Sequence, residues 1–128
     1  MAGANTQISL IEGTDPLNLE LEPWPIDKNW ILSGEPAAAG TVLNKSDDGK
    51  TAAGVWECTP GSFRWEYTWD ETVYILKGDV TITPEGGDPI RFKSGDVGHF
   101  ANGLKTRWEV AETVRKVFFL HSERPLSL

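Results

Sequence analysis

The stretch GSFRWEYTWDETVYILKG, residues 61–78, decides how this sequence folds. Every second position from residue 63 to residue 69 is aromatic, and the positions between carry Arg64, Glu66 and Thr68. A spacing of two is the period of a β-strand, whose successive side chains point to opposite faces. The stretch therefore predicts a strand with one aromatic and one polar face. Composition alone favours burial of the aromatic face, because buried charges are costly unless they are paired.

Short strand candidates followed by turn signals fill the rest of the chain from residue 52 onward, and none of them has a helical period. They cover residues 53–57, 63–69, 72–77, 80–83, 90–92, 97–100, 106–110 and 115–120. The first 50 residues hold shorter apolar pieces, read as edge strands and extended segments, at 8–11, 17–21, 24–25, 30–32 and 40–43. The sequence predicts one all-β domain: an N-terminal arm with edge strands over residues 1–50 and a barrel core over residues 51–128.

Charge and composition exclude several classes of function. The 128 residues carry a net charge of −7, which argues against nucleic-acid partners, because these are bound through basic surfaces. No apolar run approaches the ~20 residues that cross a bilayer, and we expect no membrane association. The single cysteine, Cys58, forms no internal disulfide and is expected to be a packed thiol. These features predict a cytoplasmic protein.

Residues 52–120 resemble the cupins, and in particular the small cupins similar to ureidoglycine aminohydrolase, many of which have unknown function. The first cupin motif reads His-x-His, three or four residues, Glu, six residues, Gly. Here Glu71 and Gly78 stand at the Glu and Gly positions of the motif. When four residues are counted between the second histidine position and Glu71, Arg64 and Glu66 stand where the histidines would be. In the second motif Thr106 occupies the histidine position. The resemblance implies an RmlC-like jelly-roll β-barrel of two packed antiparallel sheets with an extended N-terminal arm, and a homodimer.

This alignment with the cupin motif implies that Arg64, Glu66 and Glu71 point into the barrel. The aromatic row would then point outward, where the N-terminal arm or a second subunit would cover it. Two buried carboxylates without a metal ion would need a compensating cation. Arg64 is the expected cation, because its guanidinium can bind a carboxylate through two parallel hydrogen bonds.

The expected lumen site consists of Arg64, Glu66, Glu71, His99, Thr106 and Trp108. We expect it to bind a small polar or anionic metabolite, with no cofactor, no conventional histidine-metal centre and no assigned catalytic residue. Two alternatives stay open. One is a metal-dependent enzyme resembling ureidoglycine aminohydrolase, with a divalent metal ion on Glu71 and Glu66. The other is a non-catalytic structural or regulatory dimer whose barrel is only a scaffold for the aromatic interface. For Arg64, Glu66 and Glu71 themselves, a structural ion-pair network without a ligand is the alternative to a binding site.

Overall fold

The computed structural model describes residues 11–128, and the apolar piece predicted at 8–11 lies almost entirely outside them. The described residues form strands joined by turns, with one short 3₁₀-helix, η1 (Lys28–Trp30). The strands are β2 (Glu22–Pro23), β3 (Ile31–Gly34), β4 (Ala38–Lys45), β5 (Thr51–Cys58), β6 (Gly61–Glu66), β7 (Asp70–Pro84), β8 (Ile90–Lys93), β9 (Val97–Phe100) and β10 (Lys105–His121). The all-β prediction is confirmed.

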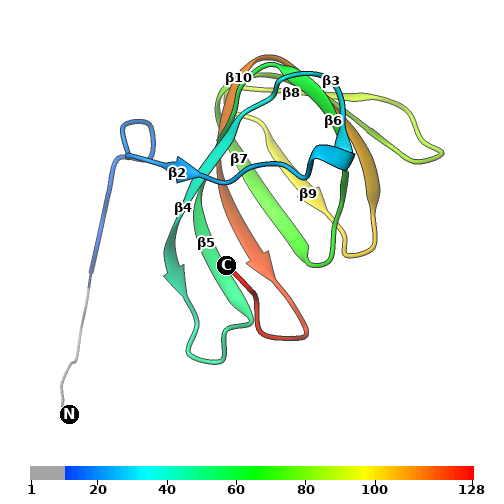
Figure 1. The fold of residues 1–128 in the computed structure, drawn as a ribbon. Coiled ribbons are helices and arrows are strands. Elements are labelled where there is room, and N and C mark those ends of the chain that lie inside the picture. The colour runs from blue at the N-terminus through cyan, green and yellow to red at the C-terminus, as the bar shows by residue number, and fades with distance from the viewer. Residues whose placement is uncertain (1–10) are drawn as a thin grey trace.

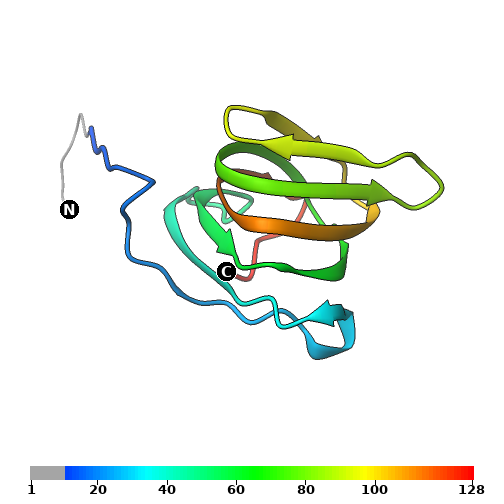
Figure 2. The same cartoon turned by 90° about the horizontal axis from the view of Figure 1, so that it is seen from above.

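The strands pair antiparallel in one continuous sheet that curls on itself (Figures 1 and 2). The hydrogen-bonded order is β2-β4-β5-β10-β6-β3, and β7 pairs with β10, β8 and β9. The first part of β10 pairs with β6 and the last part with β5, so this strand runs from one half of the curl to the other. Register shifts against β7 between Val110 and Lys116 mark where it bends. The two halves are the packed sheets of the predicted jelly roll.

Two pairs of predicted strands each form one long strand: 72–77 and 80–83 lie in β7, and 106–110 and 115–120 lie in β10. Strand β7 passes through Gly78, which has a φ of 105°. A Cβ at Gly78 would collide with the backbone of Thr113 and Val114. Glycine is therefore needed here for a kink inside a strand and not for a hairpin turn.

The expected orientation of β6 is wrong. Phe63 and Tyr67 are buried, at 1% and 2% exposure, whereas the side chain of Arg64 is 51% exposed and that of Glu66 39% exposed. Burial of the large aromatic rings contributes far more apolar surface to the core than the charged face could. The charged groups of Arg64 and Glu66 keep their hydration by facing water.

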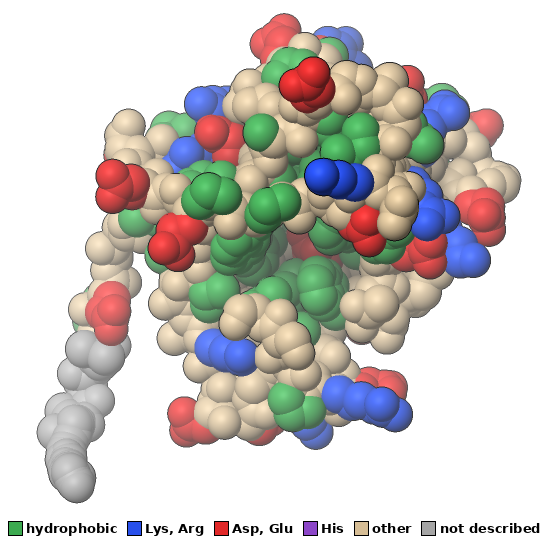
Figure 3. Space-filling model, viewed as in Figure 1, with side chains coloured by type: hydrophobic (Ala, Val, Ile, Leu, Met, Phe, Trp, Pro, Cys, Tyr) green, Lys and Arg blue, Asp and Glu red, His purple; other side chains and the backbone are tan. Residues whose placement is uncertain are grey.

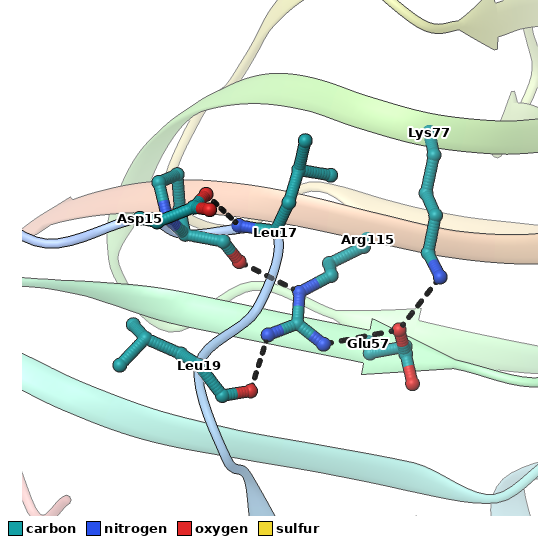
Figure 4. A network of polar contacts seen from close by, with 7 residues as sticks. Asp15, Leu17, Leu19, Glu57, Lys77 and Arg115 are labelled. Atoms are coloured by element: carbon teal, nitrogen blue, oxygen red, sulfur yellow. Dashed lines mark hydrogen bonds and ion pairs between the residues drawn. The ribbon is translucent and has the colours of Figure 1, made fainter.

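Within the N-terminal arm, residues 11–30, the segment 15–19 is fixed against the sheet by Arg115 of β10 (Figure 4). The Arg115 guanidinium donates to the carbonyls of Pro16 and Leu19, at 2.8 and 2.6 Å, and to Glu57 Oε1 at 3.2 Å. Residues 16–18 form a turn and residues 19–21 have no regular structure, so the apolar piece at 17–21 is not a strand. Within the described part of the chain, no helix is long and apolar enough to span a bilayer.

Candidate functional site

The inner side of the curl contains a pocket of about 350 Å³ with mostly apolar walls. On the face shown in Figure 3, hydrophobic side chains gather around a hollow at the centre of the molecule. Five of the six tryptophans line this pocket: Trp24, Trp56, Trp65, Trp69 and Trp108. Its volume falls in the range of small-molecule sites, which are concave and mostly apolar with a few polar groups.

Strand alternation and one glycine bring these indoles together. Trp56, Trp65 and Trp108 come from β5, β6 and β10, and the rings of Trp56 and Trp108 meet edge to face at 5.6 Å. Trp24 comes from the arm and lies directly over Gly40 of β4, where any Cβ would overlap its ring. The arm therefore forms one wall of the pocket.

A buried ion pair lies in the pocket wall. Lys116 Nζ is 2.7 Å from Glu71 Oε2, and their side chains are 7% and 5% exposed. Glu71 Oε1 accepts a second hydrogen bond from Trp69 Nε1 at 2.9 Å. The Lys116 ammonium also lies 4.6 Å from the ring centroid of Trp56 and 5.1 Å from that of Trp108. Cation–π contacts of this kind are strongest where water is excluded.

Glu71 and Trp108 are the two predicted site residues that line this pocket. The predicted partner of Glu71 is wrong: its cation is Lys116, because Arg64 lies outside and pairs weakly with Glu66 at 3.8 Å. Thr106 is buried, but its hydroxyl donates to the carbonyl of Trp65 at 2.9 Å.

His99 is exposed on β9, and its Nδ1 lies 3.1 Å from Thr72 Oγ1 on the outer side of the sheet. It does not face the lumen. Arg64, Glu66 and Thr106 instead border a shallow groove of about 410 Å³ on the outside of the molecule.

Sequence reasoning missed Lys116, although its position carried a signal. In the segment VRKVFFL, Lys116 has the same parity as Val114, Phe118 and Leu120, all of which are buried. A charge placed among inward-facing apolar residues of a strand indicates a buried partner. That partner is 45 residues away in sequence.

The pocket does not suit the metal ion that the cupin resemblance implies. Since Glu71 shares its parity with the aromatic row, the three-residue form of the motif applies, and Trp65 and Tyr67 stand at the two histidine positions. Neither is a good ligand for a divalent ion. Within residues 11–128, no three histidine, cysteine, aspartate or glutamate side chains come together in a way that could hold a metal ion. The one carboxylate side chain that lines the pocket, Glu71, is already paired with Lys116.

Two polar atoms beside the ion pair are buried without a hydrogen-bond partner: Tyr67 Oη and Trp108 Nε1. Burial, and then the negative charge of Glu71, raise the pKa of Tyr67 well above its ordinary value. The indole N–H of Trp108 opposes this shift, although the two groups are not aligned for a good hydrogen bond. Burial also raises the pKa of the Cys58 thiol to about 12, so Cys58 is a neutral packed group.

Comparison with solved structures agrees with this architecture. A protein of unknown function of the DUF861 family from Pseudomonas syringae pv. tomato is 26% identical, with a TM-score of 0.75 over 83% of this chain and 46% of that one. The chain thus spans less than half of that protein. A putative ethanolamine utilization protein EutQ from Salmonella typhimurium is 25% identical, with a TM-score of 0.60 over 71% and 72%.

The Cnp3 cupin domain of Schizosaccharomyces pombe is 17% identical, with a TM-score of 0.65 over 87% of this chain and 74% of that one, and shows the shared fold. No curated protein matches the sequence. The family model described as the EutQ-like cupin domain matches residues 45–118, which is more than half of the chain. This all-β chain, with its curled antiparallel sheet and aromatic pocket, therefore belongs to the EutQ-like cupin family.

Proposed function

We propose that this cupin binds a small organic metabolite in the tryptophan-lined pocket, with a polar or anionic group of the ligand against Lys116. The observation that carries the proposal is the combination of a cavity of about 350 Å³ with a buried ion pair in its wall. A core that served only packing would be close-packed, with few voids larger than a water molecule. A buried ion pair in a filled core would also add little to stability.

The chemistry of the walls defines the ligand class. Indole faces contact flat or aliphatic apolar groups, and such aromatic contacts contribute beyond the area that they bury. Lys116 donates one N–H to Glu71, which leaves two for an acceptor on the ligand. Glu71 has acceptor capacity left beyond its two hydrogen bonds. A ligand with an apolar body and one carboxylate or carbonyl group matches these groups.

A ureidoglycine aminohydrolase-like metal enzyme has less support. It would need a divalent ion at Glu71, and the groups around this carboxylate are indoles and an ammonium. Neither group donates an electron pair to a metal ion, because an indole N–H and an ammonium are donors of protons only.

The proposal includes a cytoplasmic homodimer. The aromatic row faces inward and therefore does not form the expected dimer surface. Tyr74, Val97 and Phe119 are exposed on neighbouring strands of the outer surface, and exposed apolar groups of this kind mark interfaces. Sedimentation of the purified protein would test the dimer.

Intrinsic fluorescence provides the test of ligand binding, because five of the six tryptophans line the pocket. Titration with phenylacetate, and with benzyl alcohol as its neutral counterpart, should change the emission saturably. A ligand at one hundred times its dissociation constant should also raise the free energy of unfolding by about 2.7 kcal/mol. If neither probe changes the emission or the midpoint of denaturation, the proposed function is wrong.

Two matched variants locate the binding site. Trp56→Phe removes part of a pocket wall and should weaken binding, whereas Arg64→Met changes only the outer surface and should leave it unchanged. Equal loss of binding in both variants would place the ligand elsewhere.

A further inference from the structure

Lys116 differs from every other lysine of this chain. All seven lysines lie in the described residues, and Lys116 alone is buried. Its Nζ is held in the wall of a ligand-sized cavity by one carboxylate and two indole faces. Lysine amines in apolar pockets are the groups that form covalent imines with carbonyl compounds. The paired carboxylate at 2.7 Å provides a place for the proton that such an amine must lose.

We propose that Lys116 forms an imine with the carbonyl carbon of a small aldehyde or ketone that enters the tryptophan-lined pocket. This proposal rests on the proposed function, since the carbonyl compound must first bind in the pocket. It goes further in giving that site a covalent chemistry and in naming the ligand class, a carbonyl compound with an apolar body.

The balance of the reaction needs no co-reactant. The Lys116 ammonium passes one proton to Glu71 Oε2, and the free amine attacks the carbonyl carbon to form a C–N bond. The carbonyl π electrons move to oxygen, which takes the proton that the attacking nitrogen loses, and a neutral carbinolamine results. Glu71 then returns its proton to the hydroxyl, which leaves as water while the nitrogen lone pair forms the C=N bond, and Glu71 is again a carboxylate. In sum, an ammonium and a carbonyl compound yield an iminium and one water, with the charge conserved.

The surroundings of Lys116 suit the product as well as the reactant. An iminium is a cation on the same nitrogen, so the Glu71 carboxylate and the faces of Trp56 and Trp108 stabilise it as they stabilise the ammonium. The apolar walls also limit access of bulk water to the C=N bond, which slows its hydrolysis.

Reductive labelling of the full chain tests the proposal. The protein is incubated near neutral pH with benzaldehyde and sodium cyanoborohydride, which reduces an imine to a stable benzylamine, and the modified residues are identified by peptide mass spectrometry. The exposed Lys28, Lys93 and Lys105 are internal references. We expect Lys116 to be modified at least about tenfold faster than these references. We also expect benzyl alcohol, which lacks the carbonyl group, to protect Lys116 alone.

The matched variant is Lys116→Arg, which keeps the charge but provides no imine-forming amine and should lose one adduct from the intact mass. The labelling rates of the individual lysines in the wild-type protein test the imine even if this variant does not fold. Labelling of Lys116 no faster than that of the exposed lysines overturns the imine. Calorimetric titration with benzyl alcohol separates the two proposals. If benzyl alcohol binds but Lys116 is not labelled preferentially, the imine is wrong and the proposed ligand binding stands. If benzyl alcohol does not bind and Lys116 is not labelled preferentially, both proposals are wrong.

Discussion

Lys116 Nζ and Glu71 Oε2 lie 2.7 Å apart inside the curled sheet, and both side chains are almost fully shielded from water. The two residues come from the two longest strands, β10 and β7, which pair along most of their length. Each ion is costly to bury alone, so the stability of the fold depends on keeping both.

Removal of one partner should therefore be strongly destabilising. Lys116→Met leaves Glu71 charged and buried with only the Trp69 indole as a donor, and we expect a loss of about 3 to 5 kcal/mol in the free energy of unfolding. Denaturation in urea measures it. Arg64→Met is the control, because the half-exposed Arg64–Glu66 pair should contribute less than about 0.5 kcal/mol. A comparable loss in both variants would contradict the burial described above.

Tyr67→Phe should leave the protein as stable as before or more stable. The Tyr67 hydroxyl is buried without a partner, so its removal relieves an unpaid desolvation cost, with a gain of up to about 1 kcal/mol at neutral pH. The variant should also resist alkali better. Since the pKa of Tyr67 is raised in the folded state, the unfolded chain releases this proton first, and stability falls as the pH rises above the ordinary value of 10.0.

Urea denaturation at a series of pH values measures this effect. Tyr74→Phe, at the exposed second tyrosine, is the control and should keep the wild-type alkaline slope. If Tyr67→Phe has the same alkaline slope as the wild type, the buried phenol is not the cause.

Gly40→Ala should displace Trp24 from the pocket. The added methyl group would overlap the indole that lies over β4, and overpacking of this kind typically costs about 1 to 3 kcal/mol. Tryptophan emission should shift to longer wavelength, and ligand binding should weaken. Gly13→Ala is the matched control, because nothing lies near its Cβ position. Wild-type emission and binding in Gly40→Ala would show that Trp24 is not a wall of the site.

Arg115→Met should release the N-terminal arm. The guanidinium binds the carbonyls of Pro16 and Leu19, and methionine cannot replace these hydrogen bonds. We expect faster amide hydrogen exchange across residues 15–26, measured by mass spectrometry, while β5 to β10 keep most of their protection. Arg107→Met, at an exposed arginine paired with Glu109, should leave the arm unchanged. Unchanged exchange in Arg115→Met would mean that packing alone fixes the arm.

Local pattern was a good guide to the strands of this protein. Each predicted strand from residue 53 onward lies within or largely overlaps an observed strand, because alternation and turn residues act over a few neighbouring positions. It was harder to predict whether two neighbouring strand segments join into one strand. A glycine at position 78 is typical of a turn, and only the tertiary structure, in which Thr113 and Val114 pack against it, has β7 continue through it.

The site could be predicted only in part. Glu71 and Trp108 were identified from motif spacing and parity, and both line the pocket. Arg64 and Glu66 were placed inside because the motif allows three or four residues before Glu71, and a change of one residue reverses every side chain in the strand. Alternation distinguishes two faces of a strand but does not say which one is buried.

The sequence by itself determined an all-β chain, the approximate strands and the alternation of aromatic with charged residues, since these depend on the period of the backbone and on neighbouring side chains. The tertiary structure decided which face turned inward and which cation neutralised Glu71. Both depend on contacts between distant segments: the rings of several strands bury apolar surface only together, and Lys116 reaches Glu71 only after β10 has paired with β7.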